Sequence, residues 1–152
     1  MGLFFEYSWV VNLRAVNSET ALSFWDMYVG WIMKNSINFE SKFKKFSNLW
    51  EPKIIAEMNN YQFKLVKIKG EFISHQHTES DEVFIVLEGK MNIQFEHETV
   101  EVNAGEMIVV PKGELHKPFS EEECKIMLVE PIGIINTGDA GGDLTAPNDK
   151  WI

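Results

Sequence analysis

Short apolar runs separated by turn residues fill the chain from about residue 52 onward. In one of them, Met91, Ile93 and Phe95 alternate with the polar Asn92 and Gln94. Because side chains on a strand point alternately to its two faces, this period of two predicts a strand with one buried face. Runs rich in Val, Ile and Phe predict eight strands: KIIAEM, QFKLVKI, EVFIVLEG, KMNIQFE, TVEV, EMIVVP, ELHKPF and CKIMLVEP.

The connections between these runs are short and carry turn signals. Asn59-Asn60, Glu88-Gly89 and Asn103-Ala104-Gly105 each separate two predicted strands, with no helical pattern in between. Consecutive strands joined in this way favour an antiparallel sheet. We therefore predict an all-β domain, an antiparallel sandwich or barrel that shortens its exposed edges. The tail from Gly133 is rich in Gly, Asn and Asp, so we expect a loop held by contacts, with Trp151 anchoring its end.

The first 32 residues differ in composition from the rest of the chain. They contain the chain's single arginine, Arg14, whereas all lysines occur from Lys34 onward. In one interpretation, Ser18 caps a short helix that runs to about Met33, and this largely apolar helix packs on the domain or across a dimer. In the other, Met33 is the true start, and residues 1–32 are an extension produced by a misassigned start.

Neither a secretory signal nor a membrane span is predicted in this extension. Glu6 lies where a signal peptide would carry basic residues. The apolar stretch from Thr20 to Met33 is interrupted by Asp26 and is shorter than the roughly 20 residues that a membrane crossing needs. We therefore expect no transmembrane helix.

Length and charge narrow the class of protein further. With 152 residues, of which 45% are hydrophobic, the chain has the size of one domain with a core. The formal net charge of −9 repels phosphate backbones and anionic membranes, which argues against nucleic-acid and membrane partners. The single cysteine, Cys124, lies in an apolar run and is expected to be buried. With no disulfide framework, the chain suits a reducing cytoplasm.

Two histidines and a glutamate occur close together in GEFISHQHTESDEVFIVLEG, residues 70–89. On a strand, His75 and His77 would point to the same face, and Glu82 opens the next apolar run, where its carboxylate can reach the same ion. Two imidazoles and a carboxylate bind iron, manganese, zinc or nickel with positions left open for a substrate or dioxygen. His116 is a fourth candidate. The alternative is that the paired histidines are simply solvated on an exposed strand.

These segments resemble the paired motifs of the cupin superfamily. The first motif is G-x4-H-x-H-x4-E-x6-G, from Gly70 to Gly89, and the second is G-x5-P-x-G-x2-H, from Gly105 to His116. The family usually has one more residue before the first histidine, and asparagine where Ser120 stands here, but neither departure affects a ligand. The resemblance covers about residues 52–131. We accordingly divide the chain into an N-terminal extension (1–32), a lead-in segment (33–51), the barrel (52–131) and a loop tail (132–152).

The resemblance implies an antiparallel double-stranded β-helix, the jelly-roll barrel of small single-domain cupins labelled mannose-6-phosphate-isomerase-like. Such proteins are commonly homodimers. One divalent transition metal, iron, manganese, zinc or nickel, would be held inside the barrel by four residues: His75, His77, Glu82 and His116. Residues that alternate with these ligands would form an apolar pocket wall, to which a bulky polyanion fits poorly: Ile73, Phe84 and Val86.

Two classes of function remain open for such a site. The chain is either a metalloenzyme that acts on a small oxygen-rich molecule, by isomerisation, lyase chemistry or dioxygen insertion, or a module that binds or senses a small ligand without converting it. Glu71 and Glu114 lie beside the motifs as available acid–base groups, although both are expected at an exposed rim. A third possibility is a degenerate barrel without metal.

Overall fold

The computed structural model describes residues 35–152 of the chain. The helix predicted after Ser18 and the alternative start at Met33 lie outside the described residues. No helix in the part described has the length and apolar character that a membrane crossing requires. One short helix, α2 (Phe39–Phe43), precedes seven strands: β1 (Lys53–Met58), β2 (Tyr61–Glu71), β3 (Glu82–Glu88), β4 (Lys90–Gln94), β5 (Thr99–Asn103), β6 (Met107–Val110) and β7 (Lys117–Pro131).

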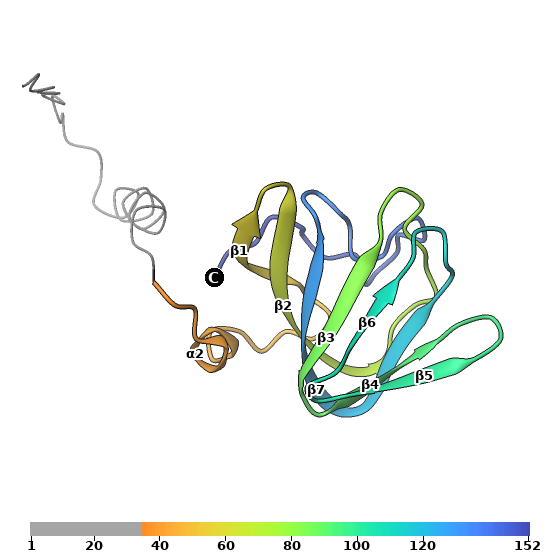
Figure 1. Cartoon of the computed structure of the whole chain (residues 1–152), viewed down its shortest axis with the longest axis horizontal. Coiled ribbons are helices and arrows are strands. Elements are labelled where there is room, and N and C mark those ends of the chain that lie inside the picture. Colours follow the sequence, from red (N-terminus) through yellow and green to blue (C-terminus); the bar gives the residue numbers. More distant parts are fainter. Residues whose placement is uncertain (1–34) are drawn as a thin grey trace, which may run out of the picture. The chain divides into compact units, whose positions relative to one another are not determined.

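All strand pairs are antiparallel, and β7 pairs with three other strands, β2, β3 and β4. The strand order is β1-β2-β7-β3-β6, and the first residues of β7 also pair with β4, which pairs with β5. In Figure 1 the β4–β5 hairpin runs at an angle to β2, β3 and β7, so that the sheet curls around one interior. The all-β antiparallel fold predicted from the turn spacing is confirmed.

The last two predicted strands, ELHKPF and CKIMLVEP, are wrong as separate elements, because the second half of the first and all of the second belong to the single strand β7. Residues 120–123, which connect them, contain no glycine or proline. Pairing with β2 continues across this segment, since Gly70 pairs with Ser120 and Ile68 pairs with Cys124, with a register shift in between. The charged run SEEE is therefore an irregularity within one long strand and not a turn.

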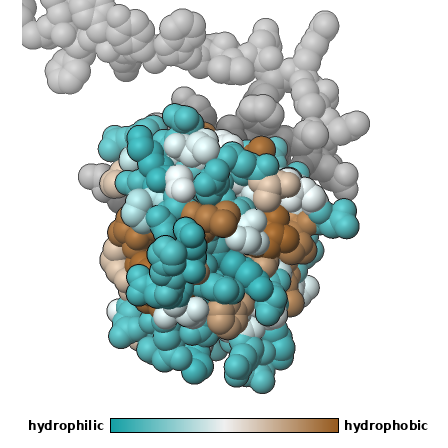
Figure 2. Space-filling model, turned by 90° about the vertical axis from the view of Figure 1, so that its right-hand side faces the viewer, coloured by the Kyte–Doolittle hydropathy of each residue, from teal (hydrophilic) through white to brown (hydrophobic). Residues whose placement is uncertain are grey.

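The main apolar core lies between the inward faces of the strands. Val66 of β2 pairs with Ile126 of β7, and Ile68 pairs with Cys124, and all four side chains are at most 2% exposed. Burying an aliphatic side chain of this size contributes roughly 1.5–3 kcal/mol. Cys124 is buried as predicted, and burial raises the pKa of its thiol to about 11. On the outer face shown in Figure 2, by contrast, hydrophilic residues surround small groups of hydrophobic ones.

The tail after β7 contains no named strand and is fixed at its end by β1. The N–H of Ile54 donates to the carbonyl oxygen of Lys150 at 2.7 Å, and the N–H of Ile152 donates to that of Ile54 at 3.1 Å. These bonds hold Trp151 beside Ile54 in a parallel bridge. The side chain of Trp151 is 55% exposed, so the backbone and not a buried indole ring anchors this end.

Candidate metal centre

His75 and His77 lie between β2 and β3, outside the named strands. The expectation that a regular strand carries them is corrected by the structure: an isolated antiparallel bridge joins His75 to His116, with N–H to oxygen bonds of 3.0 and 2.9 Å. The carbonyl oxygen of His77 accepts from the N–H of Gly113 at 2.8 Å. Both histidines are buried, at 3% and 7% exposure, so their spacing of two still turns both rings inward.

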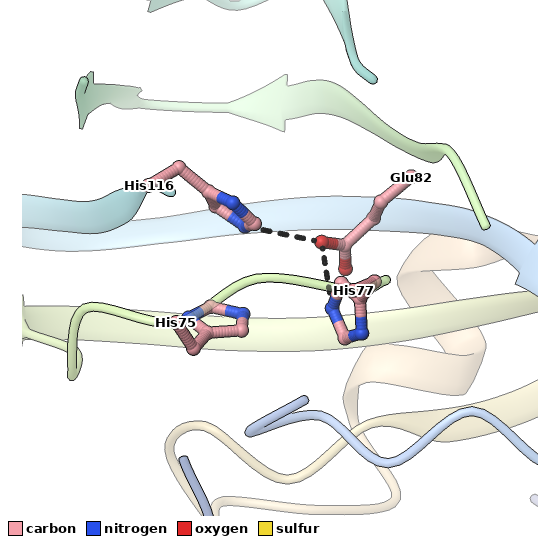
Figure 3. Close-up of side chains that lie close together, drawn as sticks. All are labelled: His75, His77, Glu82 and His116. Atoms are coloured by element: carbon pink, nitrogen blue, oxygen red, sulfur yellow. Dashed lines mark ion pairs between the residues drawn. The ribbon is translucent and has the colours of Figure 1, made fainter. Parts of the chain in front are cut away.

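Glu82 and His116 enter the same interior from other elements. Glu82 is the first residue of β3, in which the buried positions alternate with half-buried ones, and it is 3% exposed. His116 directly precedes β7 and is 1% exposed. Figure 3 shows the four side chains turned toward one another. The structure thus brings together all four residues that the sequence nominates as ligands.

The ligand atoms of the four side chains lie within 4.8 Å of one another. Glu82 Oε2 lies 3.3 Å from His77 Nε2 and 3.4 Å from His116 Nε2. These three buried atoms approach closely without the geometry of a hydrogen bond, and none has a partner among the described residues. Leaving a buried polar atom unsatisfied costs about 1–3 kcal/mol. A cation between the atoms would satisfy all three, so the donor set fits a metal ion.

The two imidazoles of the bridge are oriented by the backbone. Nδ1 of His75 lies 3.1 Å from the carbonyl oxygen of Ile73, and Nδ1 of His116 lies 2.9 Å from that of Glu114. Because a carbonyl oxygen only accepts hydrogen bonds, each Nδ1 carries the proton in these contacts. Nε2 then keeps its lone pair, which is the form in which a histidine binds a metal.

At Glu82 and His75, the site favours the protonation states that metal ligands need. Burial, with a smaller contribution from His116, lowers the pKa of His75 to about 4, so this ring is neutral near pH 7. Burial alone would raise the pKa of Glu82, but His116 and His77 outweigh it and lower the pKa to about 2. Burial would likewise lower the pKa of His77, but Glu82 outweighs it and raises the pKa. Glu82 is therefore ionised and His75 is unprotonated, as metal binding requires.

Comparisons with known proteins identify the family of the chain. The family model described as Cupin domain matches residues 64–130. YdbB of Bacillus subtilis, an uncharacterized protein, is 41% identical over 77 residues, which are 50% of this chain and 68% of that protein. The chain belongs to the cupin family. The match lies within the segment, residues 52–131, for which the motifs predict a barrel.

Two crystal structures are similar to this cupin. One is a cupin-2 domain containing protein from Shewanella frigidimarina, with 57% identity and a TM-score of 0.62 over 62% of this chain and 93% of that one. The other is NMB1881 from Neisseria meningitidis, with 36% identity and a TM-score of 0.59 over 64% of this chain and 99% of that one. The likeness to the Shewanella protein confirms the cupin fold.

A second buried polar group, which the sequence analysis missed, lies beside the metal-ligand cluster of this cupin. Lys64 and Glu130 are each 1% exposed and form an ion pair with a Nζ to Oε1 distance of 2.8 Å. Val83 pairs with Val129, so Glu82 and Glu130, each one position further along, are neighbours on the same inward face. Burial and the charge of Glu82 raise the pKa of Glu130 to about 7, against the opposing effect of Lys64. The period of two from Cys124 through Leu128 was the signal that could have placed Glu130 inside.

A cavity of about 30 Å³ adjoins the candidate ligands His75 and Glu82. Of the three wall residues named from the sequence, Phe84 lines this cavity, whereas Val86 lies in the apolar core and Ile73 is half-buried outside the lining. Between β2 and the histidines, the alternation of inward-pointing side chains shifts by one residue. Phe72 therefore occupies the place expected for Ile73. The lining comprises Trp50, Pro52, Val66, Ile68, Phe72, His75, Glu82, Phe84, Pro118, Ile126, Leu128 and Asn136.

Proposed function

We propose that this cupin binds one divalent transition metal and uses it to convert a small oxygen-containing molecule, in a reaction of the isomerase, lyase or dioxygenase type. The observation that carries the proposal is the convergence of buried donor atoms that have no partner among the described residues. Three imidazoles and one carboxylate suit iron, manganese, zinc or nickel better than the hard ions magnesium and calcium, which prefer oxygen ligands. The four ligands are His75, His77, Glu82 and His116.

A metal bound by these residues would supply Lewis-acid chemistry toward a carbonyl or enolate oxygen. The protein's own residues orient the ligands and shield the site. Backbone carbonyls fix two of the imidazoles, as described above. On the cavity side, Trp50 stacks on Phe72 with ring centroids 4.8 Å apart, and the rings of Phe72 and His75 pack in a T-shaped arrangement with centroids 5.4 Å apart. This aromatic wall keeps water away from one flank of the ligand cluster.

The cavity favours a small guest without a phosphate group. Its volume of about 30 Å³ exceeds the roughly 10–15 Å³ that one water molecule needs, but it is small. No lysine or arginine of the described chain lines it. Its polar groups are two metal ligands and Asn136, whose amide is already bonded to the carbonyl oxygens of Trp50 and Leu144 and to the N–H of Ala146. The metal would therefore be the main polar anchor for a guest.

A binding or sensing module is the second candidate, and the same lining favours it. Apart from the ligands, no acid–base group of the described chain lines the cavity. Glu71 pairs with Lys117 at 2.6 Å near the surface, and Glu114 is exposed, so neither of the carboxylates considered from sequence faces the cavity. A catalyst would change a bound molecule or consume dioxygen, whereas a module would only gain thermal stability when its ligand is added.

The first test is the metal content of tag-free protein purified without added metal. We expect near-stoichiometric iron, manganese, zinc or nickel in the wild type and its loss in His77→Ala, because the variant lacks one of the convergent nitrogen donors. His97→Ala is the matched control: the side chain of His97 is 87% exposed and lies outside the cluster. Elemental analysis by mass spectrometry measures all three proteins.

The outcomes separate the proposals. Metal in the wild type and in His97→Ala, and none in His77→Ala, supports the ligand set, and the element found narrows the reaction type. The absence of metal from all three, even after incubation with each ion, would contradict the proposed function. If metal is bound and neither dioxygen nor a panel of small hydroxy and oxo acids is consumed, the binding module becomes the better account.

A further inference from the structure

The tail after β7 packs on the backbone that carries the histidines. Residues 135–140 form a turn in which the N–H of Gly138 donates to the carbonyl oxygen of Ile135 at 2.9 Å. From this turn, the N–H of Asp139 reaches across to the carbonyl oxygen of Gln76 at 3.3 Å. Gln76 separates the two histidines, so the tail touches the chain between two of the proposed ligands.

The turn is itself fixed within the tail and against the barrel. Thr137 is fully buried, and its hydroxyl lies 2.9 Å from the hydroxyl of Thr145. The amide of Asn136 joins the tail to the carbonyl oxygen of Trp50 at 3.1 Å. These contacts make the turn a rigid surface for whatever packs against it.

His77 is the histidine that needs such a surface. The rings of His75 and His116 are each oriented by a backbone carbonyl two residues earlier, and no bond of this kind holds the ring of His77 in the described chain. Its backbone is held from one side by the N–H of Gly113. The other side faces the tail.

Gly138 leaves no spare room on that side. Its φ of +50° lies in the left-handed region, where a side chain is strained. A Cβ atom at this position would overlap the carbonyl oxygen of Gln76 and lie 3.0 Å from its carbon and 3.3 Å from Nδ1 of His77. Any residue other than glycine must therefore push the Gln76–His77 segment away from the tail.

We propose that the C-terminal tail is part of the metal centre's support, and that Gly138 is a positioning residue that allows the turn at 135–140 to hold His77 in place. The proposal rests on the metal-binding function proposed above. Residues that orient a metal ligand without binding the metal typically contribute 10- to 100-fold to affinity. The tail, which carries no cupin motif, thereby acquires a role at the site.

The test compares Gly138→Ala with Gly141→Ala in the full chain. Gly141 is in the same tail, also has a left-handed φ, of +60°, and a Cβ there would meet nothing within 4 Å. Both substitutions introduce the same kind of backbone strain, and only the first introduces a collision. Titration of the metal-free proteins with Co²⁺, followed by visible absorption, measures affinity and coordination together. We expect Gly138→Ala to bind Co²⁺ at least tenfold more weakly with an altered spectrum, and Gly141→Ala to match the wild type.

A second variant covers the case in which Gly138→Ala does not fold. Thr137→Val keeps the shape of the buried side chain but removes the hydroxyl contact with Thr145, which loosens the turn without touching Gln76. Circular dichroism first establishes that each protein is folded, and a Co²⁺ affinity several-fold below that of the wild type is then expected for Thr137→Val.

Wild-type affinity in a folded Gly138→Ala, or in Thr137→Val where Gly138→Ala is unfolded, would overturn the inference while leaving the metal centre intact. Equal losses in Gly138→Ala and Gly141→Ala would also overturn it, because strain alone would then explain the effect. Failure of the wild type itself to bind Co²⁺ would instead refute the proposed function, and this inference with it.

Discussion

The inward faces of β2, β3 and β7 carry an apolar end and a polar end on the same strands. In the apolar end, Val66, Ile126 and Val86 form one row across the three strands, each at most 2% exposed. Further along, the same alternation continues with buried polar side chains: Gln62, Lys64, Glu82 and Glu130. Within the described chain, every buried side-chain oxygen or nitrogen without a hydrogen-bond partner belongs to the polar end or to the histidines beside it.

This difference shows where the buried side chains have all the partners they need and where they do not. Aliphatic side chains satisfy one another by contact, so the apolar end requires nothing further. Buried polar groups without partners are rare in native proteins, and their concentration at one end marks a place where an ion or molecule could bind. The alternation of inward and outward positions is the same at both ends. Only the identity of the inward side chains therefore distinguishes the apolar core from the candidate site.

The largest loss of stability at the polar end is expected from removing the cation of the buried ion pair. In Lys64→Met, Glu130 loses its partner while the charge of Glu82 remains beside it. Breaking a buried pair on one side typically costs about 3–5 kcal/mol, and we expect the free energy of unfolding of the metal-free protein to fall by that amount. Urea denaturation at pH 7 measures the loss.

The double variant Lys64→Met/Glu130→Leu is the control for this prediction. It removes both charges together, and an apolar replacement of a buried pair is often neutral. We expect it to recover most of the lost stability. A double variant as unstable as the single one would show that volume, and not charge balance, limits the polar end.

A substitution in the apolar end should have a somewhat smaller effect of a different kind. Ile93 of β4 is fully buried in the core cluster and does not line the cavity. Ile93→Ala removes buried area and leaves a cavity, which typically costs about 2–5 kcal/mol. Because no ligand is disturbed, the metal content of the folded protein should stay at the wild-type level in elemental analysis.

Val109→Ala serves as the comparison for Ile93→Ala. Val109 of β6 is 48% exposed, and surface substitutions usually stay within about 0.5 kcal/mol. If Ile93→Ala loses its metal while still folded at the assay temperature, the two ends are coupled and the separation between them fails.

The sequence predicts much of the barrel because its strands obey simple periods. The runs from KIIAEM to EMIVVP correspond to β1 to β6, with ends within three residues of those predicted. The four candidate ligands were nominated on different grounds, because two motifs with fixed spacings resemble those of the cupin superfamily. The prediction for β7 was wrong at residues 120–123, because a charged run within a strand has the same composition as a loop.

The sequence of β2 did not predict that Lys64 is buried. In QFKLVKI each of the two alternating faces contains lysine and apolar residues, so period alone does not say which one is inside. In the structure Leu65 packs outward into a second cluster with Phe43 of α2, which turns Lys64 inward. The contact of Gly138 with Gln76 joins residues far apart in a segment without periodicity, and no local pattern could predict it.

The smallest expected effect is a dependence of stability on pH. It arises at the polar end and the histidines beside it, and not in the apolar end. The pKa of His75 is lowered from its ordinary value of 6.5 to about 4, mainly by burial. Between these values the unfolded chain binds a proton at His75 that the folded chain does not bind. The stability contributed by this group is therefore complete above pH 6.5 and is lost as the pH falls toward 4.

For the metal-free protein, linkage gives a loss of roughly 2 kcal/mol from His75 between pH 7 and pH 5. The raised pKa of His77 acts in the opposite direction, because its contribution is complete below pH 6.5 and is lost at higher pH. The difference between the wild type and His75→Gln isolates the first group, and urea denaturation at the two pH values measures it. Ile93→Ala, which changes the apolar end, should instead differ from the wild type by the same amount at both. If the His75→Gln difference is also constant with pH, His75 does not lie in a desolvated site, and the contrast between the two ends loses its electrostatic basis.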